Sequence, residues 1–158
     1  MYFTDKEDLF RYLLQCYLDE LTRMLQTLLD REQGDLFAAF GALFQQLVEQ
    51  RDSPSAQQFQ AILHRNAGVQ QGALLRSAGT HSLFAALSGH IDRSRLSIRR
   101  EEDLEDMFHI LTSVTAPALC AALSHADPQI AWSRLQAQLD ILRRGMEARD
   151  EPAPSHHE

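Results

Sequence analysis

Apolar residues recur along most of this chain at steps of three and four, the spacing that places side chains on one face of an α-helix. The pattern is clearest between Asp5 and Arg31, where it runs through Phe10, Leu14, Tyr17, Leu21, Met24 and Leu28. No segment alternates convincingly between apolar and polar residues with the period of two that is typical of a β-strand. The sequence therefore predicts an all-α fold.

Capping and breaking residues divide this pattern into six predicted helices joined by short loops. Gly34 ends the first helix and Asp35 can cap the second, whereas Ser53-Pro54 stops the second and opens the third. Pro117 is expected to kink or divide the fifth helix, because proline lacks an amide hydrogen and crowds the preceding turn. The predicted helices cover residues 5–31, 35–51, 53–66, 69–91, 101–122 and 127–149, with an extended connection at 96–98.

Length and composition restrict the classes of protein that are possible. A chain of 158 residues, 44% of them apolar, can bury one core and is too short for two ordinary domains. Its net charge of -7 argues against extensive phosphate binding. Cys16 and Cys120 lie far apart in helical patterns, so we expect both to be reduced and buried in a cytoplasmic protein. No apolar run approaches the roughly 20 residues that cross a bilayer, so no membrane partner is expected.

The beginning of the chain carries its most specific motif. Thr4 to Glu7 reads as a capping box for the first helix, and two aromatic residues, Tyr2 and Phe3, stand directly before it. The run YFTDKEDL at positions 2–9 resembles the junction that follows the DNA-recognition helix in TetR-family transcriptional regulators, with Met1 in place of the motif's middle residue. The order of predicted helices is similar to that family's C-terminal domain across essentially the whole chain.

The resemblance implies a division of the chain. Residues 5–149 would form an effector-binding and dimerisation domain, in which the stretch from Asp35 to Met146 is similar to the AefR-like branch. Such regulators carry a helix-turn-helix head before this point, so residues 1–4 would be the remnant of a junction with a head that this chain lacks. At that junction Tyr2 and Phe3 would pack on the head, and Lys6 would lie near the DNA backbone. Residues 150–158 are predicted to be a disordered tail.

The last two predicted helices carry apolar seams, and the resemblance implies that they meet their symmetry mates in a dimeric four-helix bundle. Small residues such as Ala118 would permit close approach of the helices. The alternative is that the same seams close the core of the protomer, because periodicity alone does not separate the two. The candidate interface residues are Leu111, Val114, Ala118, Leu135, Leu139, Leu142 and Met146.

The resemblance also implies a ligand cavity inside the bundle, lined mainly by apolar and aromatic side chains with a few polar groups. The partner would be a small apolar or aromatic effector. Each candidate has ordinary core or surface packing as its alternative. The candidate pocket residues are Phe40, Phe44, Phe59, His64, His81, Phe84, Phe108, His109 and Thr112.

Other chemistry has little support in the sequence. The seven histidines show no paired spacing with cysteine or acidic neighbours, so no metal site and no cofactor are predicted. Glycine-rich phosphate loops, nucleophile elbows and paired carboxylates in apolar surroundings are also not found, which argues against an enzyme.

The first functional hypothesis is the sensing and dimerisation portion of a TetR-like regulator, a repressor in the usual case of this family, whose head is missing through truncation or a late start codon. Effector binding would then move the first helix and change the separation of the two heads. The alternative is a stand-alone helical interaction protein that pairs with itself or with an intact regulator.

Overall fold

A computed structural model describes residues 6–54, 56–57, 80–124 and 127–148. Within these ranges the regular secondary structure is entirely helical, as predicted. The α-helices are α1 (Lys6–Arg31), α2 (Leu36–Glu49), α5 (Thr80–Leu87), α6 (Glu101–Ser124) and α7 (Pro128–Met146), and two 3-10 helices are η2 (Ser88–His90) and η3 (Arg93–Arg95).

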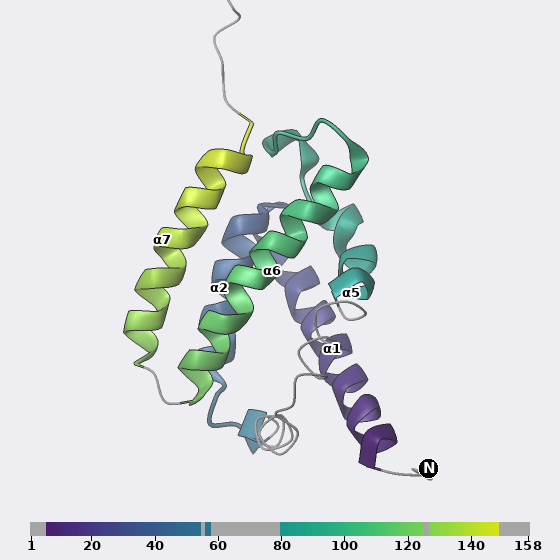
Figure 1. The fold of residues 1–158 in the computed structure, drawn as a ribbon, viewed down its shortest axis with the longest axis vertical. Coiled ribbons are helices and arrows are strands. Elements are labelled where there is room, and N and C mark those ends of the chain that lie inside the picture. The colour runs from purple at the N-terminus through teal and green to yellow at the C-terminus, as the bar shows by residue number, and fades with distance from the viewer. Residues whose placement is uncertain (1–5, 55, 58–79, 125–126, 149–158) are drawn as a thin grey trace, which may run out of the picture.

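Helix α2 lies at the centre of the described fold and packs against α1, α6 and α7. Figure 1 shows α6 crossing over α2, with α7 along one side of the pair and α1 and α5 on the other. The amino-terminal half of α1 projects away from the other helices. The core therefore surrounds α2 and is closed on opposite sides by α1 and α7.

The sequence of α2 explains its central position. Its apolar residues cover more than one side of the helix, so a single neighbour would leave part of them in water. Asp35 starts the helix by accepting hydrogen bonds from the amides of Phe37 at 3.1 Å and Ala38 at 3.2 Å. The buried residues of α2 are Leu36, Phe37, Ala39, Phe40, Gly41, Leu43, Phe44 and Leu47.

The turn between α1 and α2 also holds the loop that follows α5. Gly34 has a φ of +83°, in the left-handed region that glycine adopts without strain. Its amide donates to the Leu29 carbonyl at 2.7 Å, and its carbonyl accepts from the Asp92 amide at 3.0 Å. The glycine predicted to stop the first helix therefore also fixes a contact between distant segments.

Replacing Gly34 by alanine is expected to lower the free energy of unfolding by at least about 2 kcal/mol, because the left-handed conformation penalises a side chain and the site has no room. A Cβ there would lie 2.6 Å from the Asp92 amide nitrogen. Urea unfolding measures the loss. Gly89→Ala is the matched control, since a Cβ at Gly89 meets nothing within 4 Å. Equal stability of the two variants would contradict the close approach of Gly34 and Asp92.

Several predicted boundaries change in the structure. The fourth predicted helix ends as α-helix at Leu87 and continues as the 3-10 turn η2, while its first part and most of the predicted third helix lie outside the described residues. Pro117 does not divide α6, which continues to Ser124. The extended connection is confirmed at Leu96, which forms an isolated bridge with Glu147. The six-helix count stays a prediction, as does the disordered tail, which lies outside the described residues.

The prediction that both cysteines are buried is wrong for this chain by itself. Cys16 and Cys120 are both exposed. Cys16 lies in the projecting half of α1, and Cys120 lies one turn beyond exposed Pro117 on α6. Partial desolvation nevertheless raises the pKa of the Cys120 thiol, which keeps it protonated at neutral pH.

Helix α6 meets the length and hydropathy criteria for a membrane-spanning helix. The segment Glu101–Leu123, of 23 residues, is long and apolar enough to cross a bilayer by length and composition alone, so the prediction that no apolar run approaches this length does not hold for α6. Core helices of water-soluble proteins meet the same criterion. In α6, Leu104, Phe108 and Leu111 pack into the bundle, and 28% of the apolar window is buried inside the protomer.

Candidate functional site

The outer sides of α6 and α7 carry exposed isoleucines. Ile130 is 62% exposed, Ile141 59% and Ile110 43%, and they are the largest exposed apolar residues on these two helices. Neighbours at helical spacing extend the same surfaces. We call this set the α6–α7 face; its exposed residues are Ile110, Ser113, Pro117 and Ala121 on α6 and Ile130, Arg134, Ala137 and Ile141 on α7.

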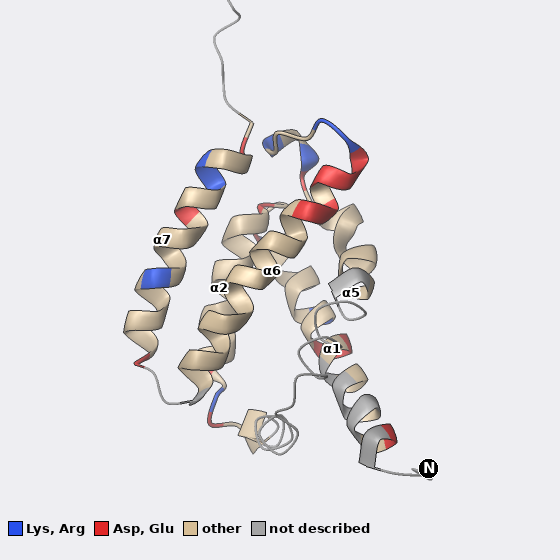
Figure 2. Ribbon diagram, in the orientation of Figure 1, with Lys and Arg blue, Asp and Glu red and all other residues tan. Residues whose placement is uncertain are grey.

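The α6–α7 face is continuous because the two helices pack against each other and bury their other sides elsewhere. On α6, Phe108 turns toward α2 and α5, and Ile110 lies about 200° further around the helix. On α7, Leu139 packs beside Gly41 of α2, and Ile141 lies about 200° further around the helix. Figure 2 shows that α6 carries no acidic or basic residue beyond its first two turns. The face is therefore largely uncharged, with Arg134 as its one charged residue among the described side chains.

The residues predicted for the dimer interface lie on the sides of α6 and α7 that are next to the exposed α6–α7 face. Leu111 and Leu135 are fully buried in the protomer, and Leu139 and Met146 are nearly so. Val114, Ala118 and Leu142 are half-buried and pack against the same core. The core alternative therefore describes Leu111, Leu135, Leu139 and Met146 within the protomer, and contact of the seams with a second copy stays a prediction. The exposed isoleucines were not among the predicted interface residues. In the sequence they form only a second, weaker apolar stripe beside the predicted seams.

A second feature is an open groove of about 400 Å³ between α2 and α7. Gly41 leaves room for the Trp132 indole, because a Cβ there would lie 3.3 Å from Trp132 Cη2. The indole stacks on Phe44 with ring centroids 5.5 Å apart. The groove is lined by Phe37, Ala38, Gly41, Ala42, Gln45, Trp132, Gln136, Leu139, Asp140 and Arg143.

Arg143 at the end of this groove holds α7 to the start of α2. Its guanidinium lies 5.1 Å from the centroid of the Phe37 ring, pairs with Asp35 at 3.2 Å and pairs with Glu147 at 2.9 Å. Because two carboxylates already share this guanidinium, it is better suited to clamping the helices together than to binding an anion. None of the residues predicted for the effector pocket lines this groove.

Three of the predicted pocket residues meet in the interior. The Phe108 ring of α6 contacts Phe40 of α2 and Phe84 of α5, each with ring centroids 5.5 Å apart and the rings strongly tilted. We call Phe40, Phe84 and Phe108 the aromatic cluster. Its members come from three helices, so a change in the packing of the cluster would change the positions of all three helices.

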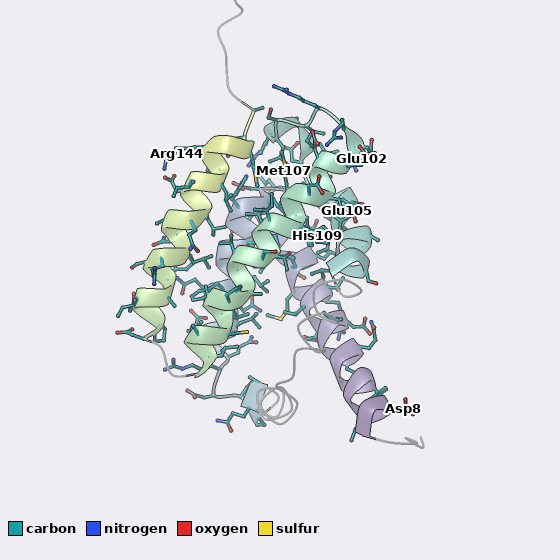
Figure 3. The ribbon with its side chains drawn as sticks, viewed as in Figure 1. Asp8, Glu102, Glu105, Met107, His109 and Arg144 are labelled. Carbon is teal, nitrogen blue, oxygen red and sulfur yellow. The ribbon has the colours of Figure 1, made fainter. Side chains whose placement is uncertain are left out.

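The other predicted pocket residues do not join this cluster. Phe44 is buried but stacks on Trp132 at the groove. His109 is half-buried, with Nε2 3.8 Å from Glu105 Oε1 one turn away on the same helix (Figure 3). Thr112 donates its hydroxyl to the Phe108 carbonyl at 2.9 Å. Phe59 and His64 lie outside the described residues, as does the side chain of His81.

Thr115 is a buried polar residue that sequence analysis missed. Its side chain is 3% exposed, and it is the one buried polar or charged residue among those described. Its hydroxyl oxygen has no hydrogen-bond partner. Thr115 lies seven residues after Phe108, which is two helical turns along the same inward face. A lone threonine in an apolar helix gives no signal in the sequence by which this could have been foreseen.

The remaining predictions receive little structural information. Tyr2 and Phe3 lie outside the described residues, and of Lys6 only the backbone at the start of α1 is described. No group of three or more histidine, cysteine or acidic residues that could hold a metal is found in the part of the chain that was placed.

These features define an all-helical domain with an aromatic interior and an exposed apolar face on its last two helices. The family model for the tetracyclin repressor-like C-terminal domain matches residues 35–146. The chain belongs to this family, whose domains are regulatory. No curated protein and no solved structure matches the chain.

Proposed function

We propose that this chain is the effector-sensing and dimerisation portion of a TetR-like transcriptional repressor of the cytoplasm, related to the AefR-like branch. Contacts with DNA would come from a helix-turn-helix and not from the described residues. Membership of the family carries the proposal. A small-molecule effector and a second copy of the chain are then the expected partners, and no cofactor is needed.

The α6–α7 face supports self-association. Burial of exposed branched aliphatic side chains by a second copy is favourable, because it removes apolar surface from water. A two-fold interface is self-complementary, so the same face on both copies would suffice. The absence of charge along most of α6 reduces the desolvation cost of such a contact. The face therefore replaces the inward seams as our candidate interface.

The position of α1 supports a mechanism by which effector binding inside the bundle would alter DNA binding. Helix α1 packs against α5, which contributes Phe84 to the aromatic cluster. Its amino-terminal half projects from the bundle, where a preceding head would be attached (Figure 1). An effector that favours a different packing of the cluster would therefore reposition the heads of a dimer and change the spacing of half-sites that they match.

Sedimentation analysis of the purified chain at micromolar concentration tests the proposal. We expect a particle of twice the mass of the chain, and no sequence-specific shift of DNA in a gel at physiological salt. Fusion behind a helix-turn-helix head that needs dimerisation should restore operator binding. A strictly monomeric chain, or one that binds a specific DNA sequence without a head, would contradict the proposal.

A further inference from the structure

The unpaired hydroxyl of Thr115 is unusual within this protein. A threonine inside a helix normally donates its hydroxyl to a carbonyl three or four residues earlier. Thr22 donates to Leu18 at 2.7 Å, Thr27 donates to Arg23 at 2.9 Å, and Thr112 makes the equivalent bond. Thr115 makes none, although it is the most buried of these threonines. A buried hydroxyl without a partner costs about 1–3 kcal/mol, so a partner supplied from outside the chain would be favoured.

The surroundings of Thr115 restrict the chemistry of that partner. Leu111 lies one turn before Thr115 on α6 and Ala122 two turns after it, and both are buried apolar residues. Among the described residues no charged side chain is buried. A charged ligand group would therefore lose its hydration without gaining an ionic partner there, which is unfavourable by several kcal/mol or more.

Thr115 and the aromatic cluster lie on one continuous surface of α6. Seven residues separate Thr115 from Phe108, which corresponds to about 10 Å along the helix axis. A ligand that contacts both must be about two rings long, with its polar atom at the Thr115 end. Both residues are closed to solvent, so entry of the ligand requires neighbouring helices to move relative to α6. Binding would thereby be coupled to helix packing.

We propose that Thr115 is the hydrogen-bonding anchor of an internal site whose ligand is an uncharged, mainly aromatic molecule with one hydroxyl or carbonyl group. This inference rests on the proposed sensing function and specifies the class of effector. The aromatic cluster supplies the apolar contacts, and Thr115 orients the single polar atom. Among the residues that the structure describes, none that is buried carries a charge that would recognise a carboxylate, a phosphate or an ammonium.

Three related probes test the inference: 4-phenylphenol, biphenyl, which lacks only the hydroxyl, and biphenyl-4-carboxylate, which is charged. Calorimetry of the full chain should show 4-phenylphenol binding at least tenfold more tightly than the carboxylate. Thr115→Val keeps the side-chain shape and removes the hydroxyl, so it should weaken 4-phenylphenol binding about fivefold and leave biphenyl binding within twofold. Thr115→Ser retains the hydroxyl and should restore the preference for 4-phenylphenol.

The melting temperature without ligand is an independent measurement. Because the Thr115 hydroxyl is unpaired, Thr115→Val should melt at the same temperature as the wild-type chain or higher. Thr112→Val is the matched control; it removes a paired hydroxyl on the same helix, so it should melt lower and should not alter the preference between the two neutral probes.

Three results would overturn the inference. Equal 4-phenylphenol affinity of the wild-type chain and Thr115→Val would show that the site has no anchor at Thr115. A lowered melting temperature of Thr115→Val would show that the hydroxyl already has a permanent partner such as an internal water. Failure of all three probes to bind would reject the internal site, whereas failure of the regulator assignment would appear separately as a monomer in sedimentation.

Discussion

Replacing Ile141 by glutamate is expected to convert dimers of this chain into folded monomers. Ile141 is largely exposed on the α6–α7 face, so the protomer loses little packing when it changes. In a two-fold dimer the substitution places a carboxylate in the interface twice, and each must be desolvated among side chains that are mainly uncharged. We expect the dimer dissociation constant to rise at least about a hundredfold, which corresponds to roughly 2.7 kcal/mol.

Sedimentation equilibrium measures this change, and circular dichroism should show unchanged helix content. Gln136→Glu is the matched control, since Gln136 is exposed on α7 but lies about 140° around the helix from Ile141. A dimer of Ile141→Glu with wild-type affinity would mean that the α6–α7 face is not the interface.

Replacing Leu139 by arginine is expected to unfold the protomer rather than merely separate two copies. Leu139 is 7% exposed and packs in the core beside α2, two residues before the exposed Ile141. An arginine there either buries an unpaired charge or forces α7 away from α2. Loss of the leucine packing together with the charge should cost about 4 kcal/mol or more, a large share of the 5–15 kcal/mol that stabilises a typical domain.

Urea unfolding followed by circular dichroism measures this loss, and Leu139→Met serves as the control because it nearly conserves the buried volume. A folded, monomeric Leu139→Arg protein of wild-type stability would show that Leu139 belongs to the dimer interface and not to the core. The opposite outcomes expected for Leu139 and Ile141 distinguish the two sides of one helix.

Local signals in the sequence were sufficient for the helices that the structure describes. Asp35 and Asp127 act as the predicted caps, each accepting a hydrogen bond from the amide two residues later. Pro128 begins α7 as predicted, because the first turn of a helix needs no amide hydrogen from that position. These interactions involve residues within a few positions of one another, which is why they can be read without knowledge of the fold.

Contacts between distant segments could not be read in this way. Gly34 was predicted to end a helix, but its contact with Asp92 depends on how the α5–α6 loop folds back. Arg143 carries no sequence signal that selects Asp35 as its partner, 108 positions away. For the aromatic cluster, residue type made its members candidates, yet it did not separate Phe44, which turns to Trp132, from Phe40, which turns to Phe108.

By itself the sequence determined the all-helical class and the main helix starts, and it indicated the family that the match over residues 35–146 supports. The interpretation of positions 2–9 as a junction stays a prediction. The tertiary structure decided which stripe of each helix is covered: Leu135 and Leu139 face the core, Ile130 and Ile141 face outward, and Thr115 is enclosed without a partner. The physical reason is that periodicity records only that a helix has apolar sides. Which side is buried depends on the free energy of packing against neighbours that are far away in the chain.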